Sequence, residues 1–158
     1  LGTGPGTLLL AALAEWREAE GLGVDASQRA LDYATRNARA LGLAERARFR
    51  LGDWAEGIAD RFDLILCNPP YVESDAALAR DVADHEPASA LFAGPDGLDD
   101  YRRIAPMLPR LIAPGGLAAI EIGHTQFADV AALLAAQGLS ASVRRDLGGR
   151  DRCVLVQP

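Results

Sequence analysis

The sequence predicts an α/β fold, in which helices cover a doubly wound, mostly parallel β-sheet with an antiparallel strand at its C-terminal end. Two observations predict it. Helical and strand-like patterns alternate along the chain, and consecutive parallel strands need a crossover helix between them. The last two strand-like runs are separated only by a turn around residues 148–149, which is typical of an antiparallel hairpin.

The first half of the chain carries two helical and two strand-like patterns. Residues 8–18 are apolar nearly all round, as in a buried helix. Residues 22–25 form a short strand, after which Ser27 caps a helix that Gly42 stops. Residues 48–51 form the next strand. The inward stripe of the second helix is expected to consist of Ala30, Leu31, Ala34, Ala38 and Leu41.

The second half begins with the apolar run 62–67, which predicts a buried strand. Residues 72–96 lack a clear period and are expected to form a long functional loop. A helix is predicted over residues 98–112, with Pro114-Gly115-Gly116 after it. The remaining elements are a strand over 117–122, a helix over 127–137 and a hairpin of strands over 140–147 and 153–156.

The composition is that of one globular domain. The chain has 158 residues, of which 49% are hydrophobic and 24% charged, and its longest apolar run is too short to span a bilayer. No segment resembles an export signal, so we expect a cytoplasmic protein without membrane contact. The formal charge is −6, which disfavours non-specific binding to nucleic acid. A protein or small-molecule substrate is therefore favoured, and direct nucleic-acid binding is not expected.

A stiff polar loop, Asn68-Pro69-Pro70-Tyr71, follows the strand over 62–67. Ligands of open α/β sheets bind outside the carboxyl ends of the strands. Each proline fixes its own φ and lacks an N–H, so the loop presents carbonyl acceptors in a rigid frame. The side-chain oxygen of Asn68 and the carbonyl of Pro69 are suited to hold a planar NH2 group by both hydrogens. A Pro-Pro turn taken alone is also consistent with a stiff loop of no further function.

A glycine-rich turn, Gly2-Thr3-Gly4-Pro5-Gly6, leads into the first helix. Glycine lets the backbone fold tightly against a ligand at a helix N-terminus. The spacing differs from the Gly-x-Gly-x-x-Gly of dinucleotide-binding turns. Such a turn needs a strand before it, and none precedes it here. We therefore expect the chain to be a fragment cut within its first strand.

Acidic residues end the next two strands. Asp25 is placed to accept the hydroxyls of a ribose, or to cap the helix that follows. Asp53 is placed to hold an adenine amino group while Trp54 covers the ring, although Trp54 also suits ordinary core packing. Each residue has a structural explanation when taken singly. Their order at successive strand ends, before the loop at 68–71, favours a ligand site.

The order Leu-Gly-Thr-Gly-x-Gly, Gly-x-Asp-x-Ser, Gly-Asp-Trp and Asn-Pro-Pro-Tyr resembles S-adenosylmethionine-dependent methyltransferases. More narrowly, it resembles the protein glutamine N5-methyltransferases of the HemK type, which act on peptide-chain release factors. The resemblance covers nearly the whole chain. It extends to residues 81–87, 90–94 and 96–101, to Pro114-Gly115-Gly116, to Glu121-Ile122-Gly123 and to residues 149–152.

The resemblance implies a seven-stranded Rossmann-like methyltransferase sheet, with its first strand truncated, in one domain over 1–158. The family's small N-terminal helical domain is expected to be absent. It implies S-adenosyl-L-methionine as cofactor, S-adenosyl-L-homocysteine as product and no metal. The cofactor-binding residues would be Gly2, Thr3, Gly4, Gly6, Asp25, Asp53, Trp54 and Asn68.

The same resemblance implies a reaction. A release factor would bring the glutamine of its Gly-Gly-Gln loop to a catalytic and substrate-binding set made of Asn68, Pro69, Pro70 and Tyr71. An amide nitrogen is a poor nucleophile because its lone pair is delocalised. Its orientation toward the activated methyl group is therefore what the site must supply. Neither His85 nor His124 is assigned as a general base, and Glu121 is consistent with either a site or a structural role.

Three other functions are consistent with the same motifs. An adenine N6-methyltransferase of nucleic acid also holds a planar amino group and stacks a ring. A glutamine of a ribosomal protein is another substrate for the same loop. A cofactor-binding domain without catalysis is the third reading, which the intact loop at 68–71 disfavours. The acidic charge and the segment 81–101 favour glutamine over adenine.

Overall fold

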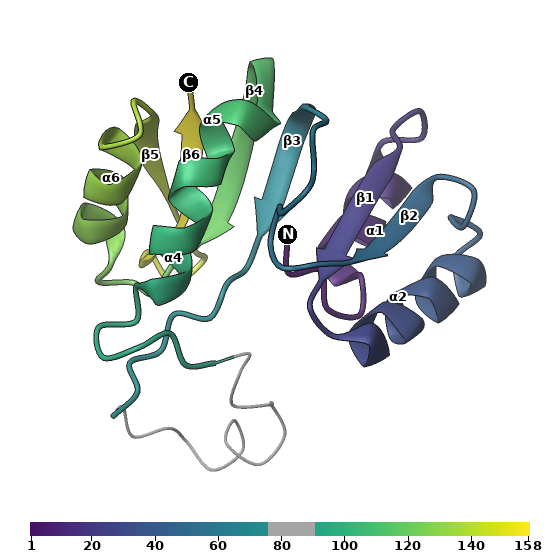
Figure 1. Ribbon diagram of the computed structural model, residues 1–158, viewed down its shortest axis with the longest axis horizontal. Helices are drawn as coiled ribbons and strands as arrows, with labels where there is room; N and C mark the ends of the chain where they lie inside the picture. The colour runs from purple at the N-terminus through teal and green to yellow at the C-terminus, as the bar shows by residue number, and fades with distance from the viewer. Residues whose placement is uncertain (76–90) are drawn as a thin grey trace. The chain divides into compact units, whose positions relative to one another are not determined.

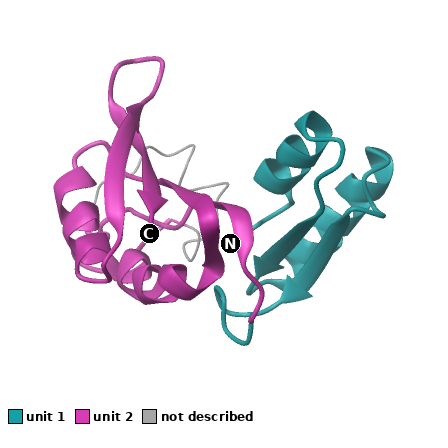
Figure 2. Ribbon diagram, turned by 90° about the horizontal axis from the view of Figure 1, so that it is seen from above, with its two compact units in different colours: residues 1–58 teal, residues 59–158 magenta. Residues whose placement is uncertain are grey.

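A computed structural model describes residues 1–75 and 91–158 of the chain (Figure 1). The chain divides into two compact units, Leu1–Ile58 and Ala59–Pro158 (Figure 2). Each unit has its own sheet and its own helices. The expectation of one domain over 1–158 stays a prediction.

The first unit is a β-α-β arrangement preceded by a helix. Its elements in chain order are α1 (Thr7–Glu15), β1 (Gly21–Asp25), α2 (Gln28–Ala40) and β2 (Ala47–Leu51). The two strands are parallel, with Gly21 opposite Ala47 and Asp25 opposite Leu51. All four elements were predicted. The first helix ends earlier than expected because Trp16 is already extended.

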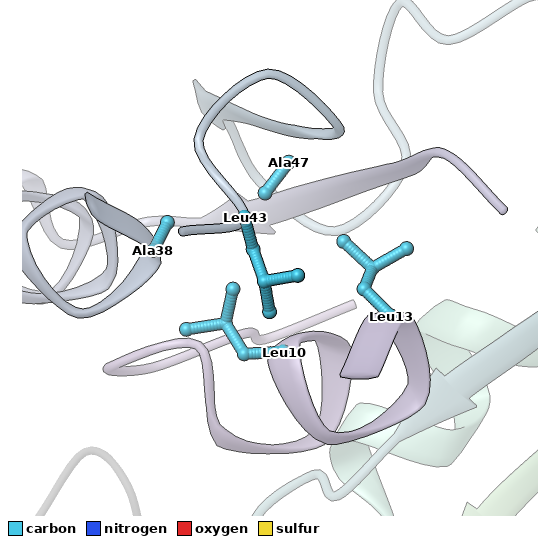
Figure 3. Packing of buried hydrophobic residues seen from close by; sticks show 5 residues of the cluster. All are labelled: Leu10, Leu13, Ala38, Leu43 and Ala47. Atoms are coloured by element: carbon cyan, nitrogen blue, oxygen red, sulfur yellow. The ribbon is translucent and has the colours of Figure 1, made fainter. Parts of the chain in front are cut away.

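The core of the first unit lies between its helices and β2. Leu10 and Leu13 of α1 meet Ala38 of α2, together with Leu43 and Ala47 (Figure 3). This cluster holds α1 against the chain that runs from α2 into β2. It therefore fixes the start of α1, where the glycine-rich turn enters.

The predicted stripe of α2 is correct for Leu31, Ala34 and Ala38, which are buried, and wrong for Leu41, which is 62% exposed. The physical reason is the way the helix ends. Gly42 adopts φ +69°, its N–H donates to Arg39 O, and the Leu43 N–H donates to Ala38 O at 2.8 Å. This is the hydrogen-bond pattern of a Schellman motif. It turns the chain so that Leu43, and not Leu41, enters the core.

The second unit contains a four-stranded sheet with the order β3-β4-β6-β5 (Figure 1). Its strands are β3 (Phe62–Cys67), β4 (Ile112–Glu121), β5 (Ser140–Arg145) and β6 (Asp151–Gln157). β3 and β4 are parallel, whereas β6 is antiparallel to both of its neighbours. The predicted C-terminal hairpin is thereby confirmed.

Helices of the second unit pack against its four-stranded sheet. They are α4 (Asp99–Ile104), a 3-10 turn η2 (Ala105–Met107), α5 (Leu108–Leu111) and α6 (Phe127–Ala135). Tyr101 and Ile104 of α4, Ile120 of β4, and Val130 and Leu134 of α6 line one small pocket. The core of this unit therefore lies between the sheet and these helices.

The prediction of one helix over 98–112 was wrong in detail. Pro106 and Pro109 lack the N–H that a continuous helix requires, and the chain forms three short helical pieces in place of one. The next strand also starts earlier than predicted, at Ile112, which lies opposite Phe62. The Pro114-Gly115-Gly116 run falls inside β4, where the pairing with β3 shifts register.

The α/β class, the parallel strand pairs and the antiparallel last strands are confirmed. The described strands form a two-stranded and a four-stranded sheet, so the seven-stranded sheet stays a prediction. In each unit the parallel strands end at one edge, since Asp25 lies opposite Leu51 and Cys67 opposite Ile120. The candidate functional residues follow these strand ends.

Replacing Arg46 by Met should lower the free energy of unfolding by about 2 kcal/mol. The Arg46 guanidinium donates to three main-chain oxygens at the end of α1, those of Leu13 (2.8 Å), Trp16 (3.1 Å) and Ala19 (2.7 Å). The Leu13 carbonyl belongs to the last turn of α1, where carbonyls lack a partner within the helix, and the other two carbonyls lie in the chain that follows. Methionine keeps the apolar stem and removes the donors, and urea titration measures the change.

Arg48→Met is the matched control. Arg48 lies on β2, its side chain is 76% exposed, and within the described part of the chain its one ion pair is with Glu20, at 3.7 Å. Its replacement should change the free energy of unfolding by less than about 0.5 kcal/mol. Equal effects of the two substitutions would contradict the capping role of Arg46.

Candidate functional site

The glycine-rich turn is built from left-handed backbone that only glycine adopts readily. Gly2, Gly4 and Gly6 have φ values of +60°, +53° and +89°. The turn is tied to β1 because the Thr3 N–H donates to Val24 O at 2.9 Å, and it closes on itself because the Gly6 N–H donates to Thr3 O at 2.9 Å. It delivers the chain directly into the N-terminus of α1.

Asp25 links this turn to the start of α2. Its Oδ2 accepts the Gly4 N–H at 2.7 Å, and its Oδ1 accepts the Ser27 N–H at 2.9 Å. An ionised carboxylate has about four acceptor positions, so about two remain for a ligand. The residue that caps α2 is Ser27, whose hydroxyl accepts the Ala30 N–H at 3.3 Å, so the capping interpretation of Asp25 is wrong. Asp25 supports the cap residue and the glycine turn, and its ribose role stays a prediction.

Trp54 lies against the glycine turn. A Cβ placed on Gly2 would meet two carbons of the Trp54 ring at 3.1 and 3.4 Å. Trp54 has φ +47° and is the only non-glycine residue with positive φ in the described part of the chain. Bulky residues hold such a backbone only where the surroundings enforce it, and these positions cluster at ligand sites. Asp53 precedes it, and both residues are partly exposed.

The loop at 68–71 leaves the end of β3 in the second unit. Asn68 is exposed, Pro69 is buried, and Pro70 and Tyr71 are partly buried. The Asn68 side chain is thus accessible while the next residue anchors the loop. Burial raises the pKa of Cys67, the residue before the loop, to about 11. A thiol with a raised pKa stays protonated near neutral pH, and the protonated form is not the nucleophilic one.

Tyr71 and Glu121 come together at the ends of β3 and β4. The Tyr71 hydroxyl donates to Glu121 Oε1 at 3.4 Å. Burial and the adjacent Glu121 charge raise the pKa of Tyr71, against the opposing effect of Arg152. Tyr71 is therefore neutral over the physiological range and presents an uncharged ring. Tyr101 donates to the main-chain oxygen of Glu121 at 2.8 Å, which fixes the end of β4.

Gln126 is a residue that sequence reasoning missed. Its Nε2 donates to Tyr71 O at 3.0 Å and to Gly97 O at 3.2 Å, and its Oε1 accepts the Gly123 N–H at 2.9 Å. Among the described residues it is the one buried polar side chain. A local signal was present, since a polar residue before a helix often reaches back to a main-chain N–H. Its distant partners at Tyr71 and Gly97 leave no such pattern.

The structure brings the predicted residues together in two groups. Gly2, Thr3, Gly4 and Gly6 meet Asp25 and Trp54 in the first unit, with Asp53 adjacent to Trp54 in sequence. Asn68 to Tyr71 form the second group, in the second unit. The shared site, with Asn68 also touching the cofactor, stays a prediction. His124 is exposed; His85 and the family-like run 81–87 lie outside the described residues.

No helix among the described residues is both long enough and apolar enough to cross a membrane. No group of three or more His, Cys, Asp or Glu side chains is arranged among them to hold a metal ion. The expectation that no metal takes part stays a prediction.

Curated proteins with sequences similar to this chain include several release factor glutamine methyltransferases. Release factor glutamine methyltransferase of Rhodospirillum rubrum is 50% identical over 160 residues, which cover 99% of this chain and 49% of that protein. The protein of the same name from Caulobacter vibrioides is 49% identical, over 98% of this chain and 55% of its own length. The chain therefore spans about half the length of the curated relatives it matches.

Solved structures show the fold. A ribosomal protein L11 methylase from Lactobacillus delbrueckii subsp. bulgaricus superposes with a TM-score of 0.69 at 20% identity, covering 99% of this chain and 66% of its own. This establishes a Rossmann-like methyltransferase fold. A protein-family model described as a methyltransferase domain matches residues 1–134. The chain therefore belongs to the methyltransferase domain family.

Proposed function

We propose that this chain transfers a methyl group from S-adenosyl-L-methionine to the side-chain amide nitrogen of a glutamine in a peptide-chain release factor. The arrangement of the loop at 68–71 is the observation that supports this reaction. It follows β3 with Asn68 exposed and Pro69 buried, so one acceptor faces solvent on a fixed frame. The substrate class is supported by relatives that are about half identical and carry that name.

The cofactor is proposed to bind at the glycine turn. Asp25 keeps about two acceptor positions beyond its bonds to Gly4 and Ser27, which suits the two hydroxyls of a ribose. Trp54 places an aromatic ring beside Gly2, which suits an adenine, and Asp53 is adjacent to accept its amino group. When bound, the sulfonium supplies an already activated methyl group. The reaction then needs neither a metal nor a side-chain nucleophile.

The loop at 68–71 is proposed to orient the acceptor amide. The side-chain oxygen of Asn68 and the carbonyl of Pro69 accept its two N–H groups, which aims the nitrogen and favours the positive charge that develops on it. Alignment of two bound reactants lowers a barrier by up to about 7–11 kcal/mol. The neutral Tyr71 ring lies against the amide plane. No described side chain is assigned as the general base.

The same proposal places both units in one domain with one seven-stranded sheet. It also places the protein in the cytoplasm, where release factors work, with no direct contact to membrane or nucleic acid. Two other methyl acceptors are tested beside the release factor. One is a glutamine of a ribosomal protein, and the other is adenine, whose amino group presents a similar pair of hydrogens.

The deciding experiment incubates the full-length natural protein with S-adenosyl-L-methionine and a purified bacterial release factor. Peptide mass spectrometry then locates the methyl group. We expect it on the glutamine of the Gly-Gly-Gln loop, with none on ribosomal protein or on an adenine oligonucleotide. A methyl group found only on one of the other two substrates would overturn the proposed substrate and keep the proposed cofactor.

Asn68→Ala should reduce turnover by at least about 100-fold and leave cofactor affinity within about twofold. The substitution removes a hydrogen-bond acceptor that acts on the transition state. Gln137→Ala is the matched control, because Gln137 is an exposed amide after α6. Single-turnover kinetics gives the rate and calorimetry the affinity. Undiminished turnover in Asn68→Ala would remove Asn68 from the reaction.

Asp25→Ala should weaken binding of S-adenosyl-L-homocysteine by about 10–100-fold, because a charged acceptor is lost. Asp32→Ala, at an exposed carboxylate of α2 that bonds Gln28, should leave the affinity unchanged. A 2′-deoxy analogue isolates the ribose contact. Wild-type protein should discriminate against that analogue, and Asp25→Ala should not. Equal discrimination in both proteins would show that Asp25 acts only through the turn.

A further inference from the structure

We propose that Gln126 is a positioning residue for methyl transfer. It would fix the exit of the loop at 68–71 and so set where Asn68 and Pro69 meet the substrate amide. This inference rests on the proposed function of that loop. It adds a residue between β4 and α6 that bonds the main-chain oxygen at the end of the loop.

The hydrogen bonds of Gln126 join three segments. Both donors of Nε2 are used, one on Tyr71 O at 3.0 Å and one on Gly97 O at 3.2 Å, and Oε1 accepts the Gly123 N–H at 2.9 Å. The side chain is only 9% exposed. A buried amide that loses one of these partners leaves an unsatisfied polar group, which is costly in a protein interior. The three hydrogen bonds satisfy both donors and the acceptor of this buried amide.

Two glycines show that the segments are packed around this amide. A Cβ on Gly97 would collide with the Tyr71 carbonyl oxygen and lie 2.7 Å from Gln126 Nε2. A Cβ on Gly123 would lie 2.8 Å from Gln126 Oε1. Real Cβ atoms do not approach so closely. The absence of side chains at both positions lets the three main-chain segments reach the same amide group.

The tetrapeptide is thereby held at both ends. At its start, Cys67 is paired with Ile120 in the sheet. After its end, the Val72 N–H donates to Leu91 O and Val72 O accepts the Ala93 N–H, both at 2.9 Å. Between these two attachments the fixed φ of two prolines leaves the main chain little conformational freedom. A shift of the Tyr71 carbonyl is therefore transmitted back to the carbonyl of Pro69.

The size of the effect follows from the sensitivity of transfer to alignment. A misplacement of about 1 Å costs about 100-fold in rate when it alters the reacting geometry. A substitution at Gln126 should thus act on kcat. A residue that served stability alone would lower the melting temperature and leave kcat of the folded protein unchanged.

Two variants of the full-length natural protein test the proposal, with the release factor as substrate. Gln126→Met keeps the length of the side chain and removes both donors and the acceptor. We expect kcat to fall by about 10–100-fold, with affinity for S-adenosyl-L-homocysteine within about twofold. Gln137→Met, at the exposed amide after α6, is the matched control and should behave as wild type.

Gln126→Glu adds a pH signature. Its carboxylate would face two carbonyl oxygens without a donor, so ionisation is disfavoured at this buried position. Protonation restores an O–H donor to one of them. The activity of this variant relative to wild type should therefore rise as the pH falls. If Gln126→Met does not fold, the ratio of Gln126→Glu activity to wild-type activity tests the proposal in its place. A ratio that is independent of pH would overturn the proposal.

Residue-resolved amide hydrogen exchange separates this inference from the proposed function. In Gln126→Met we expect faster exchange at Val72 and Ala93, with the amides of β6 unchanged. A folded variant with wild-type kcat, or with wild-type exchange at Val72, overturns the positioning role. If wild-type protein does not methylate the release factor, the proposed function fails, and the exchange of Val72 still decides the role of Gln126.

Discussion

Loops that follow parallel strands lose the ladder partners that the strands had, and their main-chain groups need others. In this chain two side chains supply them. The Asp25 carboxylate binds the N–H groups of Gly4 and Ser27, and the Gln126 amide binds Tyr71, Gly97 and Gly123. The first fixes the glycine turn at the end of β1, and the second fixes the exit of the loop after β3. The candidate functional residues depend on these two attachments.

These hydrogen bonds explain why the two loops that follow the strands are rigid. The glycine turn has no side chains of its own at three positions, so its shape is set by the bond to Asp25 and by the Trp54 ring beside Gly2. The loop at 68–71 is stiff by composition, since two of its residues are proline. A site that aligns two reactants reacts faster when both loops are rigid, because reactants already held in the reacting geometry have a lower barrier.

Much of this arrangement was visible in the sequence, and the reasons for the misses are physical. Ser27 and Gly42 marked the ends of α2 because caps are local signals. The exposure of Leu41 was missed because the Schellman motif at Gly42 turns the chain, so that Leu43 is buried in place of Leu41. The break after α4 had a signal in Pro106 and Pro109 that the apolar pattern obscured. Gln126 was missed because two of its three partners, Tyr71 and Gly97, are distant in sequence, and no periodicity records such a contact.

We propose that one cofactor molecule is bound by the glycine turn and by the loop at 68–71. Amide hydrogen exchange with and without S-adenosyl-L-homocysteine measures which of these two segments the ligand protects. We expect slower exchange in the ligand-bound protein at Gly4 and Gly6 and also at Asn68 and Tyr71. Slowing confined to the residues of the first unit would contradict a shared site.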